Sequence, residues 1–194
     1  MAVADSPHGP WRKLDEPILS AADNSEWLGD EDDRFAVVSK GDFDSHKVHD
    51  PCLIHYADRF WLYYKGEQMG EGFTFGGREI RWGAVADHPE GPYVKSAWHP
   101  VTKRPRGVCV DLSRRCRFVD DGRPEKNTFQ YAPDGVNFEI VAVLKGAPEA
   151  LGPFRPAKPS DTDPFDGIRW GLCHVYHEGW QYIRRFDAVL PHHR

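Results

Sequence analysis

A short segment at the start of the chain recurs further along. Residues 2–11 read AVADSPHGPW, and residues 84–93 read AVADHPEGPY. The second copy begins within EIRWGAVAD (79–87), whose apolar–polar alternation predicts a strand. Each copy therefore marks a strand and the turn that leads into the next one. A repeated strand–turn unit favours a fold that is built by repetition of one small sheet.

Aromatic and β-branched segments separated by Gly, Pro and Asp occupy much of the chain. They predict strands over 49–56, 59–66, 79–87 and 91–97, which would form one antiparallel meander. A second set includes a hairpin within 126–146 that turns at Asp134 and Gly135, and a third has two strands within 168–187. Such four-stranded units are typical of a β-propeller. We expect an all-β fold, a partial β-propeller with about three blades, in one incomplete domain over 1–194.

The repeat also indicates where each predicted blade begins and ends along the sequence. The chain would hold the outer half of one blade, two whole blades and the inner half of another. An open ring exposes apolar side chains and unpaired strand edges, so we expect a piece of a larger propeller. The segments 5–33 and 146–167 are rich in Pro, Gly and acidic residues, which predicts long loops between the blades.

Composition excludes several classes of protein. The 194 residues are 40% hydrophobic and 13% aromatic, enough to bury a core. A net charge of -5 without an acidic or basic tail argues against nucleic acid and anionic membranes as partners. No apolar run is long enough for a membrane span, and four cysteines without a C-x-x-C pair predict neither a zinc site nor a disulfide framework. The chain shows no signal-peptide pattern, which leaves cytoplasm and periplasm both open.

Several longer motifs carry a family resemblance. GDFDSHKVHDPCLI, KGEQMGEGFTFGG, HPEGPYVKS and KNTFQYAPDGVNFEI together resemble glycoside hydrolase family 117, five-bladed propellers that act on agar fragments. The resemblance implies an inverting exo-enzyme that removes 3,6-anhydro-L-galactose through its α-1,3 linkage from neoagaro-oligosaccharides. An oligosaccharide is then the expected partner. The family is related to the family 43 arabinan and xylan enzymes, so a different terminal sugar is an alternative.

Glycoside cleavage requires carboxylates that converge on the scissile bond. Asp50 stands at the start of HDPCLI, where an apolar strand makes an unused charge costly. The resemblance implies that Asp50 stabilises the transition state and tunes the acid without transferring the proton itself. The structural alternative is that Asp50 caps a turn before Pro51.

Five further residues are candidates for the site. His49, Lys65, Glu67 and Arg78 are predicted to bind substrate near the mouth of the channel, although they would serve equally as a surface ion network. His174 is predicted to bind substrate and to face a divalent cation through water, as in related propeller hydrolases; the alternative is a core histidine with its hydrogen bonds satisfied. No other cofactor is expected.

The remaining catalytic groups of the family do not match this sequence. The resemblance implies a base aspartate in a blade that the chain lacks, and a Gly-His-Glu triplet just after PVT (100–102), with the His as general acid. Pro105, Arg106 and Gly107 stand in place of that triplet. One hypothesis is a frameshift over 103–124, because codons can be chosen for this segment that restore Gly-His-Glu when read one base later. The alternative is a genuine basic insertion, and resequencing the gene decides between them.

The segment has a structural consequence if it is real as written. Arg114, Arg115 and Arg117 would take positions that should be apolar, and burying unpaired guanidinium groups is costly. We therefore expect the segment to loop into solvent.

Two classes of function follow. The first is a glycosidase of agar-fragment metabolism. The second is a catalytically inactive fragment, or a sugar-binding remnant, that lacks the base aspartate and the His-Glu pair; activity of the isolated chain is not expected. The resemblance also implies a domain-swapped homodimer that is built with an N-terminal helical segment. That segment is not found in this sequence, so a homodimer of this type is doubtful here.

Overall fold

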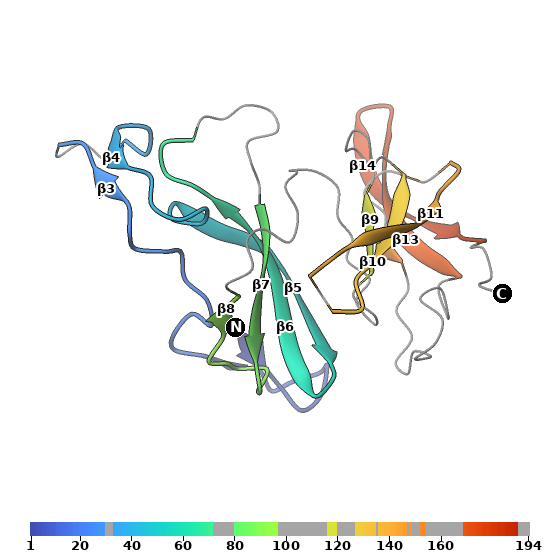
Figure 1. The fold of residues 1–194 in the computed structure, drawn as a ribbon. Helices are drawn as coiled ribbons and strands as arrows, with labels where there is room; N and C mark the ends of the chain where they lie inside the picture. The colour runs from blue at the N-terminus through green and yellow to red at the C-terminus, as the bar shows by residue number, and fades with distance from the viewer. Residues whose placement is uncertain are drawn as a thin grey trace. The chain divides into compact units, whose positions relative to one another are not determined.

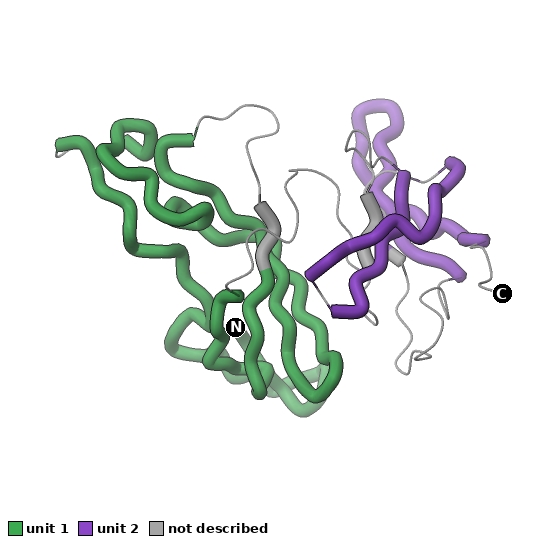
Figure 2. The backbone as a smooth tube through the Cα atoms, in the orientation of Figure 1, with its two compact units in different colours: residues 1–100 green, residues 101–194 purple. Residues whose placement is uncertain are grey.

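A computed structural model describes residues 1–29, 33–71, 80–96, 116–119, 127–134, 136–146, 148, 152–153 and 169–189. The chain divides into two compact units, Met1–Pro100 and Val101–Arg194 (Figure 2). Each unit is described by itself below. That residues 1–194 form one incomplete propeller domain stays a prediction.

Every regular element in the described ranges is a strand, which confirms the all-β prediction (Figure 1). Among these residues no helix is long and apolar enough to cross a membrane.

The main sheet of the first unit contains four antiparallel strands in sequence order: β5 (Lys47–Tyr56), β6 (Arg59–Glu67), β7 (Ile80–Ala86) and β8 (Val94–Lys95). This is the predicted meander, with a shorter last strand than expected. Three consecutive residues of β6, Leu62, Tyr63 and Tyr64, are buried. Because successive side chains of a strand point to opposite faces, β6 is covered on both faces and forms the centre of the unit.

Two small sheets precede this meander. One pairs β1 (Ala2–Val3) with β2 (Arg12–Lys13), and the other pairs β3 (Glu26–Trp27) with β4 (Val37–Ser39). Both copies of the repeated segment therefore form a strand, a turn and a second strand: β1–β2 in the first copy and β7–β8 in the second. The stretch 5–33, predicted as a loop, also contains β2 and β3, each of two residues.

The core of the first unit includes a buried carboxylate. Leu62, Tyr64 and Ala84 form the apolar cluster, and Asp44 is 1% exposed beside it. Oδ2 of Asp44 accepts a hydrogen bond from the Tyr64 hydroxyl at 3.0 Å and one from Lys95 Nζ at 2.6 Å. Burial and the nearby Asp44 carboxylate together raise the pKa of Tyr64. Asp44 thus ties the loop before β5 to both β6 and β8.

The second unit contains two three-stranded sheets. The first has the order β11 (Glu139–Val143), β10 (Thr128–Tyr131), β9 (Cys116–Val119). The second has the order β12 (Gly152–Pro153), β13 (Trp170–His177), β14 (Trp180–Asp187). Buried Phe129 of β10 packs with buried Cys173 of β13, so these sheets share one core.

The predicted hairpins of the second unit are confirmed. Strands β10 and β11 pair antiparallel, and the Asp134 carboxylate caps their turn by accepting hydrogen bonds from the amides of Val136 and Asn137, each at 2.8 Å. Gly135 lies outside the described residues. The two strands predicted within 168–187 are β13 and β14, and β12 is a strand that the prediction did not include.

The expectation that 103–124 loops into solvent is wrong for part of its length. Within that segment, Cys116–Val119 forms β9 and pairs in regular antiparallel register with β10, with Val119 opposite Thr128 and Cys116 opposite Tyr131. The argument from buried arginines considered side chains alone, whereas the open edge of β10 offers backbone hydrogen bonds to any extended segment. The other residues of 103–124 lie outside the described ranges, and the frameshift hypothesis stays a prediction.

Candidate functional site

Asp50 lies inside β5, at a break in the regular pairing with β6. The register shifts between His49 and Cys52, and Asp50 has a left-handed backbone with φ of 50°. The next residue, Pro51, has no backbone N–H and cannot complete a ladder at this point, so the sequence Asp-Pro favours such a bulge. Asp tolerates the left-handed region better than most residues. The bulge leaves the Asp50 side chain 59% exposed, and Asp50 is therefore part of a strand and not a turn cap.

Lys65 stabilises the ionised form of Asp50. It lies on β6 opposite His49, and its Nζ is 2.6 Å from Asp50 Oδ2. The hydrogen bond from Lys65 lowers the pKa of Asp50; partial burial opposes this effect, and the charges of Lys65 and His49 reinforce it. Asp50 is consequently a carboxylate throughout the neutral pH range.

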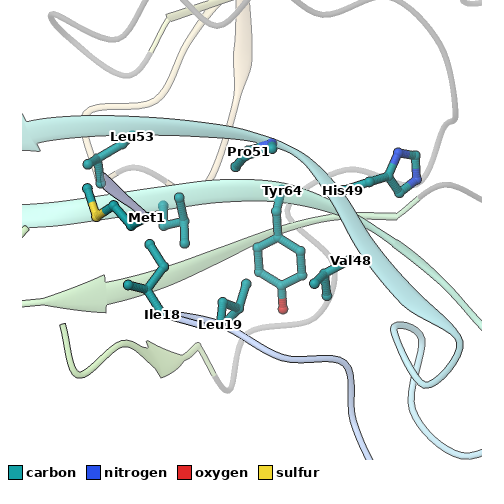
Figure 3. A pocket seen from close by; sticks show the side chains of 9 residues that line it. Met1, Ile18, Leu19, Val48, His49, Pro51, Leu53 and Tyr64 are labelled. Carbon is teal, nitrogen blue, oxygen red and sulfur yellow. The ribbon is translucent and has the colours of Figure 1, made fainter. Parts of the chain in front are cut away.

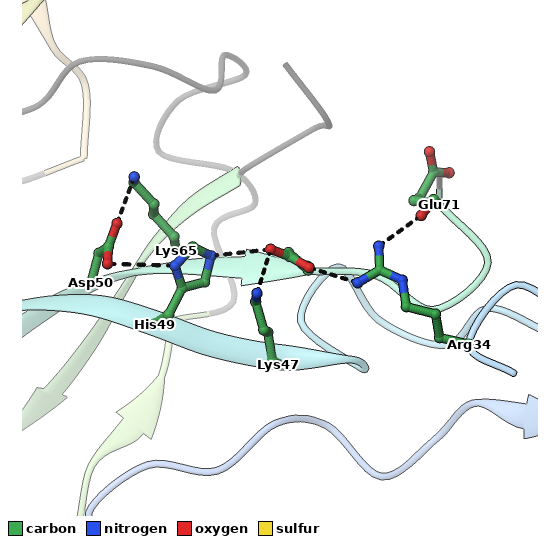
Figure 4. A network of polar contacts seen from close by, with 7 residues as sticks. Arg34, Lys47, His49, Asp50, Lys65 and Glu71 are labelled. Carbon is green, nitrogen blue, oxygen red and sulfur yellow. Dashed lines mark hydrogen bonds and ion pairs between the residues drawn. The ribbon is translucent and has the colours of Figure 1, made fainter. Parts of the chain in front are cut away.

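His49 lies between two carboxylates (Figure 4). Its Nδ1 is 3.5 Å from Asp50 Oδ1, and its Nε2 is 3.5 Å from Glu67 Oε1. The buried Nε2 makes no hydrogen bond in the described structure, so it lies within ion-pair distance of Glu67 without being hydrogen-bonded to it. The imidazole thus connects Asp50 on β5 with Glu67 on β6.

Glu67 is the centre of the remaining contacts. Its Oε1 lies 2.9 Å from Lys47 Nζ, and its Oε2 accepts a hydrogen bond from Arg34 at 2.8 Å. Burial alone would raise the pKa of Glu67, but the hydrogen bonds from Arg34 and Lys47 outweigh it and hold that pKa below its usual value. Arg34 also donates to the backbone oxygen of Glu71 at 2.9 Å (Figure 4). Both carboxylates of the site are therefore ionised at neutral pH.

Four of the six predicted site residues come together in this network: His49, Asp50, Lys65 and Glu67. Arg78 lies outside the described residues. His174 lies in the second unit, on β13 opposite Ile183, and its side chain is exposed, so it is not a core histidine. The roles assigned to these residues stay predictions.

The sequence interpretation missed two members of the network. Lys47 precedes His49 by two residues and pairs with Glu67 across the strands. A correct prediction of the register between β5 and β6 would therefore have indicated Lys47. Arg34 comes from the loop before β4, and no local pattern marks it.

Among the described residues, no group of three or more His, Cys, Asp or Glu side chains could hold a metal ion, and the cation role of His174 stays a prediction.

An apolar pocket of about 320 Å³ lies next to the network (Figure 3). His49 belongs to both, whereas Asp50 does not line the pocket. The pocket is lined by Met1, Ile18, Leu19, Val48, His49, Pro51, Leu53, Leu62 and Tyr64. Its walls offer few partners to sugar hydroxyls, so the polar network carries the chemistry of the site.

The charge states limit what the carboxylates can do. A general acid in glycoside cleavage needs a raised pKa, whereas those of Asp50 and Glu67 are both lowered. An ionised carboxylate instead stabilises the positive charge of an oxocarbenium-like transition state. The arrangement is therefore suited to electrostatic stabilisation, and the proton donor would be a different group.

Comparison with known proteins finds one family among the structures similar to this chain. No protein-family model and no curated protein matches the sequence. Among solved structures, the chain is similar to Zg3597, a family 117 glycoside hydrolase produced by the marine bacterium Zobellia galactanivorans, with a TM-score of 0.67 and 30% sequence identity. The match covers 96% of this chain and 50% of that one, so the chain spans about half the length of that relative. Over the half of that relative that it spans, the chain is therefore similar to a family 117 glycoside hydrolase.

Proposed function

We propose that the chain contributes Asp50 and the residues around it to the active site of a glycoside hydrolase. This enzyme removes terminal 3,6-anhydro-L-galactose from neoagaro-oligosaccharides by cleaving the α-1,3 linkage with inversion. The observation that carries the proposal is the state of Asp50, an ionised and half-exposed carboxylate that Lys65 holds on a bulge of β5. The structural similarity to a family 117 glycoside hydrolase supports glycoside hydrolysis as the reaction class. The proposed fold is a partial five-bladed propeller in which β5–β8 form one blade.

Each residue of the network has a role in this proposal. Asp50 faces the anomeric carbon and stabilises its developing positive charge. Lys65 stabilises the charge of Asp50 and donates to a sugar oxygen, while His49 contacts a neighbouring hydroxyl. Glu67 is paired with Lys47 and Arg34, and it holds the imidazole of His49 in place.

The alternative is a sugar-binding fragment without catalytic activity. One observation favours it: both carboxylates of the network have lowered pKa values, so neither is the general acid. In this case the same contacts would bind the terminal sugar without cleaving it.

Titration calorimetry of the 194-residue protein with neoagarobiose, with analysis of the products, tests both proposals. Asp50→Asn removes the charge at the site, and Asp58→Asn is the matched control, because Asp58 is an exposed aspartate with a left-handed backbone at the far end of the same hairpin. In the proposed site Asp50 also accepts a hydrogen bond from a hydroxyl of the bound sugar, so binding should weaken by about tenfold or more in Asp50→Asn only.

The outcomes separate the two functions. Release of 3,6-anhydro-L-galactose supports the hydrolase, and binding without release supports the fragment. Absence of binding, or equal weakening by both substitutions, contradicts the assignment of Asp50 to a sugar site.

A further inference from the structure

The imidazole of His49 has an orientation that its own hydrogen bonds do not explain. Its Nδ1 lies 3.5 Å from Asp50 Oδ1, and its Nε2 lies 3.5 Å from Glu67 Oε1. The Nε2 atom is buried, yet it makes no hydrogen bond in the described structure. A carboxylate at this distance from a buried nitrogen acts strongly on it, so the orientation of the ring depends on where Glu67 places Oε1.

Glu67 has little intrinsic preference for the way its carboxylate faces. The last side-chain torsion of Glu is broad, so the two oxygens can turn about the Cγ–Cδ bond unless both are held. Oε1 is held by Lys47, whose Nζ lies at 2.9 Å and whose side chain is 44% exposed. An ammonium group on a flexible stem acts as a point charge, and the carboxylate can turn about such a contact. The orientation therefore has to be fixed at Oε2.

Arg34 supplies the contact at Oε2 (Figure 4). Its Nη1 donates to Glu67 Oε2 at 2.8 Å, and the side chains of Arg34 and Glu67 are 17% and 16% exposed. A guanidinium group is planar and carries its donors in a fixed fork, so it restricts a carboxylate more than an ammonium group does. Arg34 is thus a more buried and more directional partner of Glu67 than Lys47 is.

Arg34 is itself anchored just after the strand that carries Glu67. Its Nη2 donates to the backbone oxygen of Glu71 at 2.9 Å, and its own backbone oxygen accepts a hydrogen bond from the Gly70 amide at 2.7 Å. Both partners follow the end of β6 at Glu67. Because these bonds run in both directions between the two segments, the guanidinium fork keeps its place relative to the Glu67 carboxylate.

We propose that Arg34 is the positioning residue of the sugar site. It fixes Oε2 of Glu67, which directs Oε1 toward His49, and the imidazole in turn stays beside Asp50, where the terminal sugar binds. Arg34 acts through Glu67 and makes no contact with the sugar. The effect on the sugar rests on the proposed function, whereas the effect on His49 is measurable without any sugar.

The variant Glu67→Gln tests which cation sets the orientation. Arg34 and Lys47 can only donate hydrogen bonds, so each of them favours the single oxygen of the new amide. If Arg34 prevails, that oxygen faces Arg34, and the amide nitrogen donates to Nε2 of His49. If Lys47 prevails, the oxygen faces Lys47 and His49, and Nε2 carries a proton toward it.

Nitrogen-15 NMR of the His49 ring, at a pH at which the ring is neutral, distinguishes these two states. We expect Nε2 in Glu67→Gln to be the nitrogen that carries no proton and accepts a hydrogen bond. A protonated Nε2 in this variant would overturn the proposal.

Arg34→Lys tests the fork while the positive charge is kept. A lysine cannot donate to Glu67 Oε2 and to the Glu71 backbone oxygen with the same geometry. Lys40→Met is the matched control, because Lys40 Nζ lies 2.7 Å from Glu71 Oε1 and has no ion pair with Glu67 among the described residues. We expect the His49 ring resonances to shift in Arg34→Lys alone, and neoagarobiose to bind that variant about three- to thirtyfold more weakly.

The outcomes separate positioning from a purely structural role. A structural Arg34 would lower the midpoint of denaturant unfolding in Arg34→Lys and leave the His49 resonances unchanged, which contradicts the proposal, as would equal shifts in Arg34→Lys and Lys40→Met. If neoagarobiose binds to none of these proteins, the proposed function fails, and the His49 resonances still decide the role of Arg34. If Arg34→Lys does not fold, Glu67→Gln decides it.

Discussion

At the scale of single residues, the site depends on two lysines that each control a different carboxylate. Lys65 contacts Asp50, and Lys47 contacts Glu67, although both lysines lie within the same pair of strands. This separation allows the electrostatic account to be tested with one substitution as the control for the other.

Lys65→Met should raise the pKa of Asp50 toward the ordinary aspartate value of about 3.9, because the hydrogen bond from Lys65 is the main cause of its depression. A carbon-13 NMR titration of the carboxyl groups measures this shift. Lys47→Met should leave Asp50 unchanged and raise the pKa of Glu67 instead. A shift of Asp50 by both substitutions, or by neither, would refute the pairwise assignment.

The pairing of Glu67 predicts a pH dependence of stability. Its pKa is lower in the folded protein, so the stabilisation is present above the unfolded value of about 4.3 and is lost as pH falls through the folded value. Glu67→Gln should therefore reduce the free energy of unfolding on the order of 2 kcal/mol at pH 7 and less at pH 3. Denaturant unfolding at both pH values checks this, and a difference that does not change with pH would contradict it.

Residue types were predictable from the sequence here, but contacts were not. The start of an apolar strand and the family resemblance marked Asp50 as a residue of interest, and Lys65 and Glu67 were candidates because they stand where the second strand ends. The bulge between His49 and Cys52 shifts the pairing, so the cross-strand partners could not be read from a regular register. Burial of Asp44 was not predicted, since its partners Tyr64 and Lys95 lie 20 and 51 residues away.

At the scale of elements, the sheet β5–β8 owes part of its arrangement to a close approach at Gly66. A Cβ at this position would lie 2.6 Å from Asp44 Cβ and would also overlap the Phe43 ring. The loop before β5 can therefore pack directly on β6 only because residue 66 has no side chain.

Gly66→Ala should destabilise the first unit by about 1–3 kcal/mol, the usual range for overpacking. Gly83→Ala is the matched control on the neighbouring strand β7, where a Cβ would meet only Tyr63 Cε1 at an ordinary 3.9 Å. Chemical denaturation followed by circular dichroism measures both variants. Equal stability of the two would show that the loop does not pack on β6 as described.

Strong periodicity explains which elements were predictable. The apolar–polar alternation and the turn residues of 47–95 predicted all four strands of the meander. The two-residue strands β3 and β12 carry no such pattern, because one hydrogen-bonded step needs no particular side chains. For the same reason, β9 forms in a segment whose arginines argued against a sheet.

At the scale of the whole molecule, one sheet face of the second unit carries exposed apolar side chains beside polar ones such as His174 and Gln181. Leu172, Tyr176 and Ile183 point to the same side of β13–β14, and Tyr176 and Ile183 are 66% and 74% exposed. In a propeller, such a face packs against the next blade. Left bare, it is a surface for association.

We therefore expect the purified chain to self-associate as its concentration rises. Ile183→Lys should reduce association, measured by light scattering, more than Gln181→Lys, which adds the same charge to the same face without removing apolar area. A monomer that melts sharply and cooperatively at all concentrations would contradict the expectation.

The central claim is that Asp50 is the charged group of a sugar site on one blade of an incomplete ring. An experimental structure of the protein with neoagarobiose bound tests it most directly. The account predicts a ring oxygen or the anomeric carbon of the terminal sugar within about 3.5 Å of the Asp50 carboxylate, with β5–β8 as an open blade. A sugar bound away from Asp50, or sheets that close into a self-contained barrel, would contradict it.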